Sequence, residues 1–248
     1  MDTAQTPLHD AVIVITGSTS GIGRAMALEL STLGASIVVN SSNHHDEGQR
    51  LASELPHSLY VGGSITEEGF ASHFIEEVIH HYGRLDVLIN NAATTKVIPH
   101  RDLLQADRAT WRTIFETNVF ATFDLITHAA PHLKDSKGQI LNVASLAGLR
   151  PTGSSIPYAA SKAALIHVTT LLAAALAPEV RVNAVAPGLV DTPWTEDWDA
   201  VRAQYQRTAP LQRSATPEDV SHLVTALIQT PYLTGAIVPL DGGMGLVR

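Results

Sequence analysis

Tyr158 and Lys162 stand four residues apart, a spacing that suits proton transfer to an alcohol or ketone oxygen. On a helix, residues i and i+4 are neighbours on one face, so the Lys162 ammonium would lie beside the Tyr158 phenol. A nearby cation favours the phenolate, by about 1.4 kcal/mol for each unit by which the pKa falls. A tyrosine adjusted in this way can exchange a proton with a substrate. Such pairs are also common on helix surfaces, so this assignment needs support from other motifs.

Ser145 lies thirteen positions before Tyr158, at the end of the apolar run 140–144. A strand over this run would deliver the Ser145 hydroxyl to the region of the tyrosine and the lysine. A hydroxyl placed there can hold a substrate oxygen while negative charge develops on it. The three side chains together predict a site for hydride-transfer chemistry on a carbonyl or alcohol.

A run of small residues near the start of the chain has the pattern of a dinucleotide-binding turn: Thr16-Gly17-Ser18-Thr19-Ser20-Gly21-Ile22-Gly23. It follows the apolar run 11–15 and precedes the amphipathic stretch 24–33, which indicates strand, turn and helix. Small residues let the backbone approach a pyrophosphate, and the free N–H groups and positive dipole at the helix start favour its charge. Gly34 is the expected helix C-cap, and residues 36–40 supply the next strand of a βαβ unit.

These motifs make the chain resemble the short-chain dehydrogenase/reductase family, in its compact single-domain branch. The glycine spacing is G-x-x-x-G-x-G, and the other motifs follow in the family's order: Asn90-Asn91-Ala92-Ala93, Asn118, the Ser145, Tyr158 and Lys162 set, Asn183-Ala184-Val185-Ala186-Pro187-Gly188 with Thr192, and Asp241-Gly242-Gly243. The resemblance covers nearly the whole chain. It implies an NAD(P)-dependent oxidoreductase that transfers hydride between the nicotinamide and a ketone or secondary alcohol.

The resemblance also implies a catalytic tetrad of Asn118, Ser145, Tyr158 and Lys162. Tyr158 would be the acid and base, and Ser145 would orient the carbonyl. Lys162 would lower the pKa of the tyrosine and bind the nicotinamide ribose. Asn118, within a long helical stretch, would hold a water that links Lys162 to solvent.

The cofactor contacts implied by the resemblance fall on the glycine turn and on the ends of several strands. They are Gly17, Ser18, Thr19, Ser20, Gly21, Ile22, Gly23, Asn40, Ser41, Ser42, Ser64, Ile65, Asn91, Ala92, Ala93, Tyr158, Lys162, Pro187, Gly188, Val190 and Thr192. The chain departs from the family's pattern at Ala93, where glycine is usual, and at Ser64, where aspartate is usual. A serine hydroxyl can replace an aspartate as the acceptor for the adenine amino group. Both departures are expected to change affinity rather than the chemical step.

The stretch after the second strand bears on which nicotinamide cofactor is used. An acidic residue at this place usually holds the ribose 2′-OH of NAD. Here residues 39–45 contain no acid, and Asn40, Ser41 and Ser42 can donate hydrogen bonds to a phosphate. An arginine clamp is missing as well. The sequence therefore favours NADP(H), with NAD(H) as the alternative.

Length and composition predict one α/β domain over residues 1–248, a Rossmann-like doubly wound parallel sheet with helices on both faces. Strands are expected near residues 11–16, 36–40, 58–62, 86–90, 139–144, 180–186 and 236–240. The formal net charge of −8 argues against nucleic acid and anionic membranes as partners. The chain has no cysteine, and residues 1–10 show no signal-peptide pattern, so a cytoplasmic location is the default.

The stretch 163–177, directly after Lys162, contains no Asp, Glu, Lys or Arg. A helix that is apolar nearly all round must be covered on more than one side, so a homodimer or homotetramer is expected. Asp124, His128 and His132 share one helix stripe, but no further ligand supports a metal site, and none is predicted.

A substrate lid is expected near residues 189–215, where Trp194, Trp198 and Tyr205 are candidates for an aromatic cover. Residues 94–100 and 146–156 would form the other walls for a small-molecule carbonyl or alcohol substrate. One alternative is a 3-oxoacyl-(acyl-carrier-protein) reductase, although no basic residue for an acidic carrier occurs between Lys162 and Arg181. The alternative from another class is a non-catalytic dinucleotide-sensing regulator, which an intact tetrad disfavours.

Overall fold

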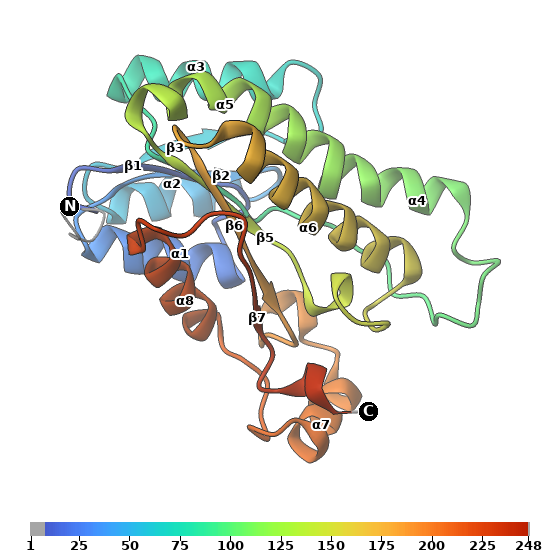
Figure 1. Ribbon diagram of the computed structural model, residues 1–248. Coiled ribbons are helices and arrows are strands. Elements are labelled where there is room, and N and C mark those ends of the chain that lie inside the picture. The colour runs from blue at the N-terminus through green and yellow to red at the C-terminus, as the bar shows by residue number, and fades with distance from the viewer. Residues whose placement is uncertain (1–7, 248) are drawn as a thin grey trace.

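Seven short apolar runs form one parallel sheet in the computed structural model, which describes residues 8–247 (Figure 1). The strands are β1 (Val12–Ile15), β2 (Ser36–Ser41), β3 (Leu59–Gly62), β4 (Val87–Asn90), β5 (Gln139–Val143), β6 (Arg181–Pro187) and β7 (Ile237–Leu240). Each lies within one or two residues of its predicted bounds, so the predicted doubly wound α/β fold is confirmed. Of residues 1–10, for which no signal peptide was predicted, residues 1–7 lie outside the described part of the chain.

The strand order β3-β2-β1-β4-β5-β6-β7 explains where a ligand can bind. The chain builds outward from β1 to β3, then returns to the other side of β1 with β4. The loops after β1 and β4 therefore diverge and leave a crevice at the carboxyl ends of these strands, the usual ligand site of open α/β sheets. Most strand residues are buried Val, Ile, Leu or Ala, as a sheet covered on both faces requires.

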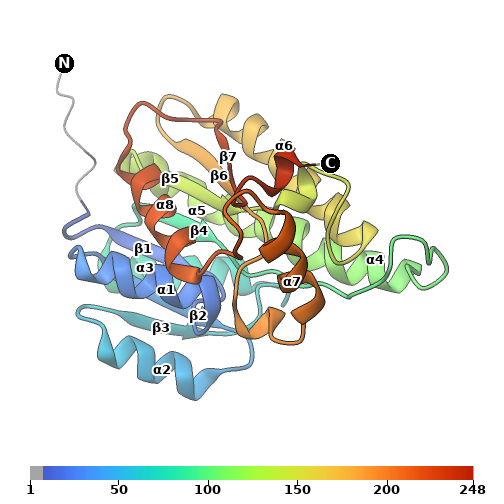
Figure 2. The same cartoon turned by 90° about the horizontal axis from the view of Figure 1, so that it is seen from below.

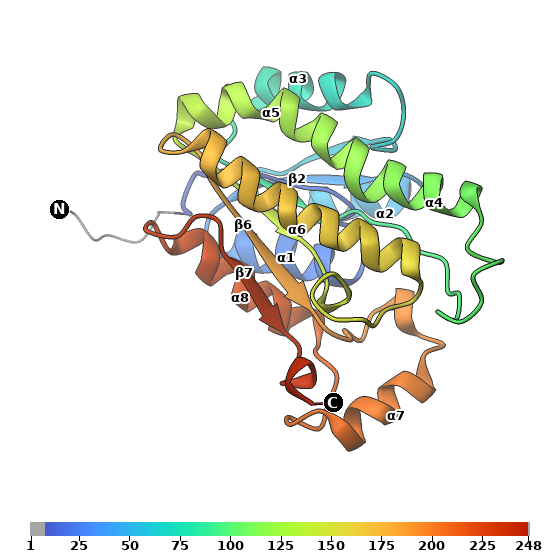
Figure 3. The ribbon, with the colours of Figure 1, turned by 45° about the vertical axis from the view of Figure 1, so that its right-hand side comes forward.

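Helices cover both faces of the sheet, and each face has its own apolar core. One face is covered by α1 (Gly21–Thr32), α2 (His45–Glu54) and α8 (Pro217–Gln229), as Figure 2 shows. The other carries α3 (Phe70–Tyr82), α4 (Arg108–Phe115), α5 (Thr122–Ser136) and α6 (Ile156–Leu176). Figure 3 shows α5 and α6 side by side on this second face.

The predicted end of α1 is confirmed. The α1 helix is followed by Gly34 at φ +89°, a left-handed conformation that favours glycine. The α8 helix starts with a capping box, in which Thr216 and Asp219 each bond the other's backbone N–H. Asn118 lies within a long helical stretch, as predicted: its segment is a π-helix, η1 (Glu116–Ala121), which joins α4 directly to α5.

The lid region forms a separate small layer beyond the carboxyl ends of β6 and β7 (Figure 1). It contains the 3-10 turn η3 (Pro193–Thr195) and the helix α7 (Asp199–Thr208). Its apolar core joins Leu189, Tyr205 and Ala209, with Trp198 and Met244 packed against them. A second 3-10 turn, η2 (Leu146–Gly148), follows β5, and a third, η4 (Met244–Leu246), follows β7.

Candidate active site

A cavity of about 990 Å³ opens at the carboxyl ends of the strands and brings most of the predicted catalytic and cofactor residues together, although Asn118 does not line it. Ser145, Tyr158 and Lys162 line it from β5 and α6, and the glycine turn after β1 lines its other side. A cavity of this size is large enough for the nicotinamide end of a dinucleotide together with a small substrate.

The start of α6 explains why Tyr158 and Lys162 are placed where they are. Ser155 caps the helix, since its side chain accepts a hydrogen bond from the Tyr158 N–H at 3.4 Å, and Pro157 occupies the first turn. Lys162 follows one turn later and is 3% exposed. Its Nζ donates to the Val143 carbonyl at 2.8 Å and lies 5.9 Å from the centroid of the Tyr158 ring. The predicted neighbourhood of phenol and ammonium is present.

The pKa shifts in the site differ from the prediction. Burial raises the pKa of Tyr158, and an interaction with the Ser145 hydroxyl only partly opposes this. Burial also lowers the pKa of Lys162 to about 8, so this side chain is still mostly protonated at pH 7. Burial is the largest cause of the Tyr158 shift and Lys162 is not among its causes, so the predicted lowering of the Tyr158 pKa by Lys162 is not seen.

Asn118 is almost fully buried, and its side chain has no free hydrogen-bonding group. Its Oδ1 accepts from the Thr94 N–H at 2.8 Å, while its Nδ2 donates to the Thr94 carbonyl at 3.0 Å and to the Ser161 hydroxyl at 3.0 Å. The side chain thus ties the loop after β4 to the turn of α6 that carries Lys162. A water relay at this position would have to use backbone groups of η1, where the π-type pattern loosens the hydrogen-bond ladder.

The glycine turn is a cradle that a larger residue would fill. Gly17 and Gly21 have φ of +62° and +50°. A Cβ on Gly23 would lie 2.3 Å from the Gly17 carbonyl oxygen and 2.8 Å from Asn91 Nδ2. Asn91 braces the turn, since its Nδ2 donates to the Thr16 and Gly17 carbonyls at 2.9 and 3.0 Å. Ser18 is buried, and neither it nor Gly23 lines the cavity, so both shape the turn from beneath.

The first turn of α1 is free to bind a phosphate. The N-cap residue Ser20 makes no side-chain capping hydrogen bond, and the first turn contains no acidic residue. The unsatisfied N–H groups and positive dipole at this end therefore face the cavity, together with Thr19, Gly21 and Ile22. These residues fit a dinucleotide pyrophosphate.

The far end of the cavity is lined by Ser41, Ser42, Asn43 and His44, but not by Asn40. The Asn40 amide Nδ2 donates to the Val61 and Gly63 carbonyls at 3.0 and 3.1 Å. The side-chain amide of Asn40 is thus already bonded to carbonyls of β3 and of the residue after it. The predicted donation from Asn40 to a phosphate is therefore not supported.

Ser64 and Ile65 also do not line the cavity. The Ser64 hydroxyl lies 2.8 Å from that of Thr66, so the short side chain pairs with its neighbour rather than replacing an aspartate. By contrast Ala92, Ala93, Pro187, Gly188, Val190 and Thr192 all line the cavity as predicted. The Thr192 side chain would lie 3.2 Å from a Cβ on Gly21, so these two loops approach each other closely.

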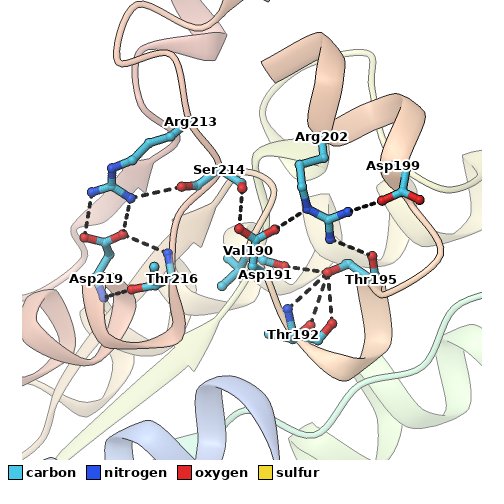
Figure 4. A network of polar contacts seen from close by, with 10 residues as sticks. All are labelled: Val190, Asp191, Thr192, Thr195, Asp199, Arg202, Arg213, Ser214, Thr216 and Asp219. Atoms are coloured by element: carbon cyan, nitrogen blue, oxygen red, sulfur yellow. Dashed lines mark hydrogen bonds and ion pairs between the residues drawn. The ribbon is translucent and has the colours of Figure 1, made fainter. Parts of the chain in front are cut away.

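A polar network holds the lid against the strand ends (Figure 4). Arg202 of α7 donates to Asp191 at 2.8 Å, to Asp199 at 2.8 Å and to the Thr195 carbonyl at 3.1 Å. Asp191 also accepts from the Ser214 hydroxyl. Burial would raise the pKa of Asp191, but the hydrogen bonds from Ser214 and Arg202 keep it below its usual value. The lid is therefore tied directly to the segment that carries Val190 and Thr192.

His100, Ser154 and Gln204 also line the cavity, on the segments 94–100, 146–156 and 189–215 that were predicted as walls and lid, although none of the three was predicted individually. They lie on segments that follow strand ends, which was the available signal, but no residue type among them indicates a specific reaction. His128 lies 3.7 Å from Asp124 on α5. Within residues 8–247 no cluster of three or more metal-ligating side chains is present.

Comparisons with known proteins agree with this geometry. A family model described as enoyl-(acyl carrier protein) reductase matches residues 17–245. Ketoacyl reductase 2 of the granaticin polyketide synthase of Streptomyces violaceoruber is 44% identical over 240 residues, which cover 95% of this chain and 96% of that protein.

Two solved structures are similar over almost the whole chain. A short-chain dehydrogenase/reductase from Burkholderia xenovorans has a TM-score of 0.89 at 34% identity, covering 96% of this chain and 98% of that one. A 3-ketoacyl-(acyl-carrier-protein) reductase from Brucella melitensis, complexed with NADH, has a TM-score of 0.89 at 28% identity, covering 96% and 99%.

Proposed function

The chain belongs to the short-chain dehydrogenase/reductase family, and from that premise we propose that Tyr158, Ser145 and Lys162 carry out its chemical step. The protein is an oxidoreductase that acts on CH–OH and C=O groups with a nicotinamide dinucleotide. The observation that carries the proposal is the presence, in one cavity, of a proton-transfer group and a phosphate-binding turn.

In the reducing direction a nicotinamide dinucleotide held at the glycine turn would supply the hydride for the carbonyl carbon. The Ser145 hydroxyl donates a hydrogen bond to the carbonyl oxygen, which gains negative charge as the carbonyl π bond breaks. Tyr158 gives its phenolic proton to that oxygen and completes the secondary alcohol. The Lys162 ammonium, mostly protonated at pH 7, stabilises the phenolate that remains. The raised pKa keeps Tyr158 protonated before the reaction, which is the form that ketone reduction needs.

The test of this function is turnover of NADPH or NADH with purified protein and a panel of ketones, β-ketoesters, quinones and an enoyl thioester. Oxidation of the reduced cofactor with a carbonyl compound is expected. If the protein binds the dinucleotide but reduces none of the carbonyl compounds, the result would favour a non-catalytic dinucleotide-sensing regulator over an enzyme.

A carrier-bound 3-oxoacyl substrate is the second candidate. It is supported by the names of the Streptomyces and Brucella relatives. The segment 97–100 of the cavity wall is also flanked by Lys96 and Arg101, which supply positive charge for an acidic carrier near the cavity. This observation offsets the lack of basic residues between Lys162 and Arg181.

NADP(H) is the proposed cofactor, because the cavity wall at the adenosine end carries Ser42, Asn43 and His44 and no acid. Ser42→Asp would place a carboxylate there, and we expect the Kd for NADPH to rise at least about ten-fold while that for NADH changes much less. Fluorescence titration of both cofactors measures the two constants.

Ser42→Asn is the uncharged control for this substitution and is expected to keep the NADPH preference. Tighter binding of NADH than of NADPH by the unsubstituted protein would contradict the assignment, and the NADH complex of the Brucella relative makes that comparison necessary.

We further propose that the chain forms a homo-oligomer through α6. Among the described helices, α6 is the one long and apolar enough to cross a membrane by length and composition, with a hydropathy of 1.5. Its inner face packs on the sheet, while Leu171 is 57% exposed and Phe120 and Phe123 are also exposed on the neighbouring segment. A second copy of this surface would cover these side chains.

Leu171→Glu is expected to shift the protein toward the 26.5 kDa protomer in sedimentation or light-scattering measurements, because a carboxylate cannot be buried unpaired in such an interface. Leu104→Glu, at another exposed leucine on the loop before α4, is the control and should leave the mass unchanged. An unchanged mass for Leu171→Glu would contradict the proposed interface.

A single domain with a lid near residues 189–215 and a cytoplasmic location stay predictions.

A further inference from the structure

The part of the cavity beyond Tyr158 has mainly apolar walls, with His100, Ser154 and Gln204 among the polar side chains that also line the cavity. Its apolar side chains come from the loop after β4, from η2 and the loop after it, and from the lid: Val97, Ile98, Pro99, Leu146, Ala147, Pro151, Trp194, Trp198 and Val201. Among the described residues that line the cavity, Lys162 is the one lysine or arginine, and its Nζ is bound to Val143. Asp197 is the one carboxylate. A substrate carboxylate or phosphate would thus be buried without a counter-charge, so the walls fit an uncharged, apolar substrate.

Trp194 is one of two tryptophans in these walls and lies directly beside the acid and base. The centroids of the Trp194 and Tyr158 rings are 6.3 Å apart, and the ring planes meet at 81°, an edge-to-face contact. Trp194 is nevertheless 48% exposed. An indole that lines the cavity and keeps about half of its surface uncovered provides a flat apolar area for a ligand beside the Tyr158 ring.

The turn that carries Trp194 is held on both sides (Figure 4). The Thr195 hydroxyl donates to the Val190 carbonyl at 2.7 Å and accepts from the Thr192 N–H at 3.2 Å. Arg202 donates to the Thr195 carbonyl and is itself bound to Asp191. Because the neighbouring residue is fixed in this way, the indole is positioned before a ligand arrives, which reduces the entropy lost on binding.

We propose that Trp194 selects the substrate: a planar, uncharged ring ketone whose ring lies against the indole while its carbonyl reaches Tyr158 and Ser145. This inference rests on the proposed function and names the substrate class for the same site. Stacking against an aromatic face adds binding free energy beyond that from burying apolar area. A saturated ring of the same size lacks this extra contribution.

Two bicyclic ketones separate stacking from size. 2-Tetralone and 2-decalone share one carbon skeleton, and in neither is the carbonyl conjugated to a ring, but only tetralone has an aromatic ring. With the unsubstituted protein we expect kcat/KM for 2-tetralone to exceed that for 2-decalone about five- to ten-fold, as stacking energies of aromatic pairs suggest. Trp194→Leu is expected to bring this ratio close to one, and Trp194→Phe to keep most of it.

Tyr232→Leu is the matched control, since it removes a fully exposed aromatic ring that does not line the cavity, and it should leave the ratio unchanged. Titration with the reduced dinucleotide checks that each variant is folded. If Trp194→Leu loses the fold, the Phe variant still tests the proposal, because a ratio lost with phenylalanine in place would contradict stacking.

Different results would reject the role of Trp194 and the proposed function. A ratio near one in the unsubstituted protein, or an unchanged ratio in Trp194→Leu, would overturn the role of Trp194 while ketone reduction stands. A strong preference for the linear N-acetylcysteamine thioester of 3-oxobutanoate over both bicycles would also overturn it and support the carrier-bound substrate. Absence of turnover with every carbonyl compound would instead reject the proposed function.

Discussion

Tyr158→Phe is expected to lower kcat for ketone reduction by about 10²- to 10⁴-fold, the range that a positioned general acid contributes. The substitution removes one hydroxyl and keeps the ring, so the edge-to-face contact with Trp194 is retained. Ser145 can still hold the carbonyl oxygen but has no neighbouring base to replace its proton. The decrease in absorbance of the reduced nicotinamide at saturating substrate measures the effect.

The control for this prediction is Tyr82→Phe. Tyr82 is another partly buried tyrosine, whose hydroxyl donates to the His57 carbonyl and whose pKa burial raises to about 12, but it lies outside the cavity. We expect Tyr82→Phe to change stability slightly and kcat not at all. Tyr158→Phe should also bind NADPH with nearly unchanged affinity. Normal turnover by Tyr158→Phe would show that the proton comes from elsewhere and would reject the proposed mechanism.

Gly23→Ala is expected to weaken dinucleotide binding at least about a hundred-fold, because the added methyl cannot be accommodated. Its position lies 2.3 Å from the Gly17 carbonyl oxygen and 2.8 Å from Asn91 Nδ2. One partner is backbone and the other holds the glycine turn, so the turn must move and the phosphate-binding N–H groups move with it. Overpacking of this kind also costs about 1–3 kcal/mol of stability. Fluorescence titration with NADPH and thermal unfolding measure the two effects.

Gly69→Asn is a suitable comparison. Gly69 has φ +77°, and a Cβ there meets nothing within 4 Å, so asparagine, which tolerates this conformation, should preserve both affinity and stability. Gly21→Ala has another cause of strain, since its Cβ would meet only the Thr192 side chain, at 3.2 Å, but alanine disfavours the φ of +50° at this position. It is expected to fold and to bind NADPH less well. Unchanged NADPH affinity in Gly23→Ala would mean that the glycine turn is not the phosphate site.

The predictable parts of the fold are those set by short stretches of sequence. All seven strands were found because each contains a short apolar run, and the five inner strands, which are covered on both faces, need no alternation. The end of α1 was found because Gly34 acts locally. The placement of Tyr158, Lys162 and Ser145 around one cavity followed from helix geometry and from the end of one strand.

The parts that sequence could not predict depend on partners distant in the chain. Asn40 has a side chain that could bind a phosphate, but in the folded sheet its amide donates to the Val61 and Gly63 carbonyls. Asn118 has the right type for holding a water, but Thr94 and Ser161 occupy its side chain. The pKa of Tyr158 depends on how completely folding removes water from the phenol, and a spacing of four residues carries no information about that.

The α6 helix links the outer surface of this protein to its active site, which affects both its evolution and its engineering. Its first turns carry Tyr158 and Lys162, its inner side packs on the sheet, and its outer side exposes Leu171. At about 1.5 Å per residue, Leu171 is only about 14 Å along the axis from Lys162. Because a helix moves as a stiff rod, a substitution that tilts α6 at its outer side also displaces the phenol. Selection on the outer surface is therefore linked to selection on catalysis, and variants made for solubility at α6 need their turnover measured.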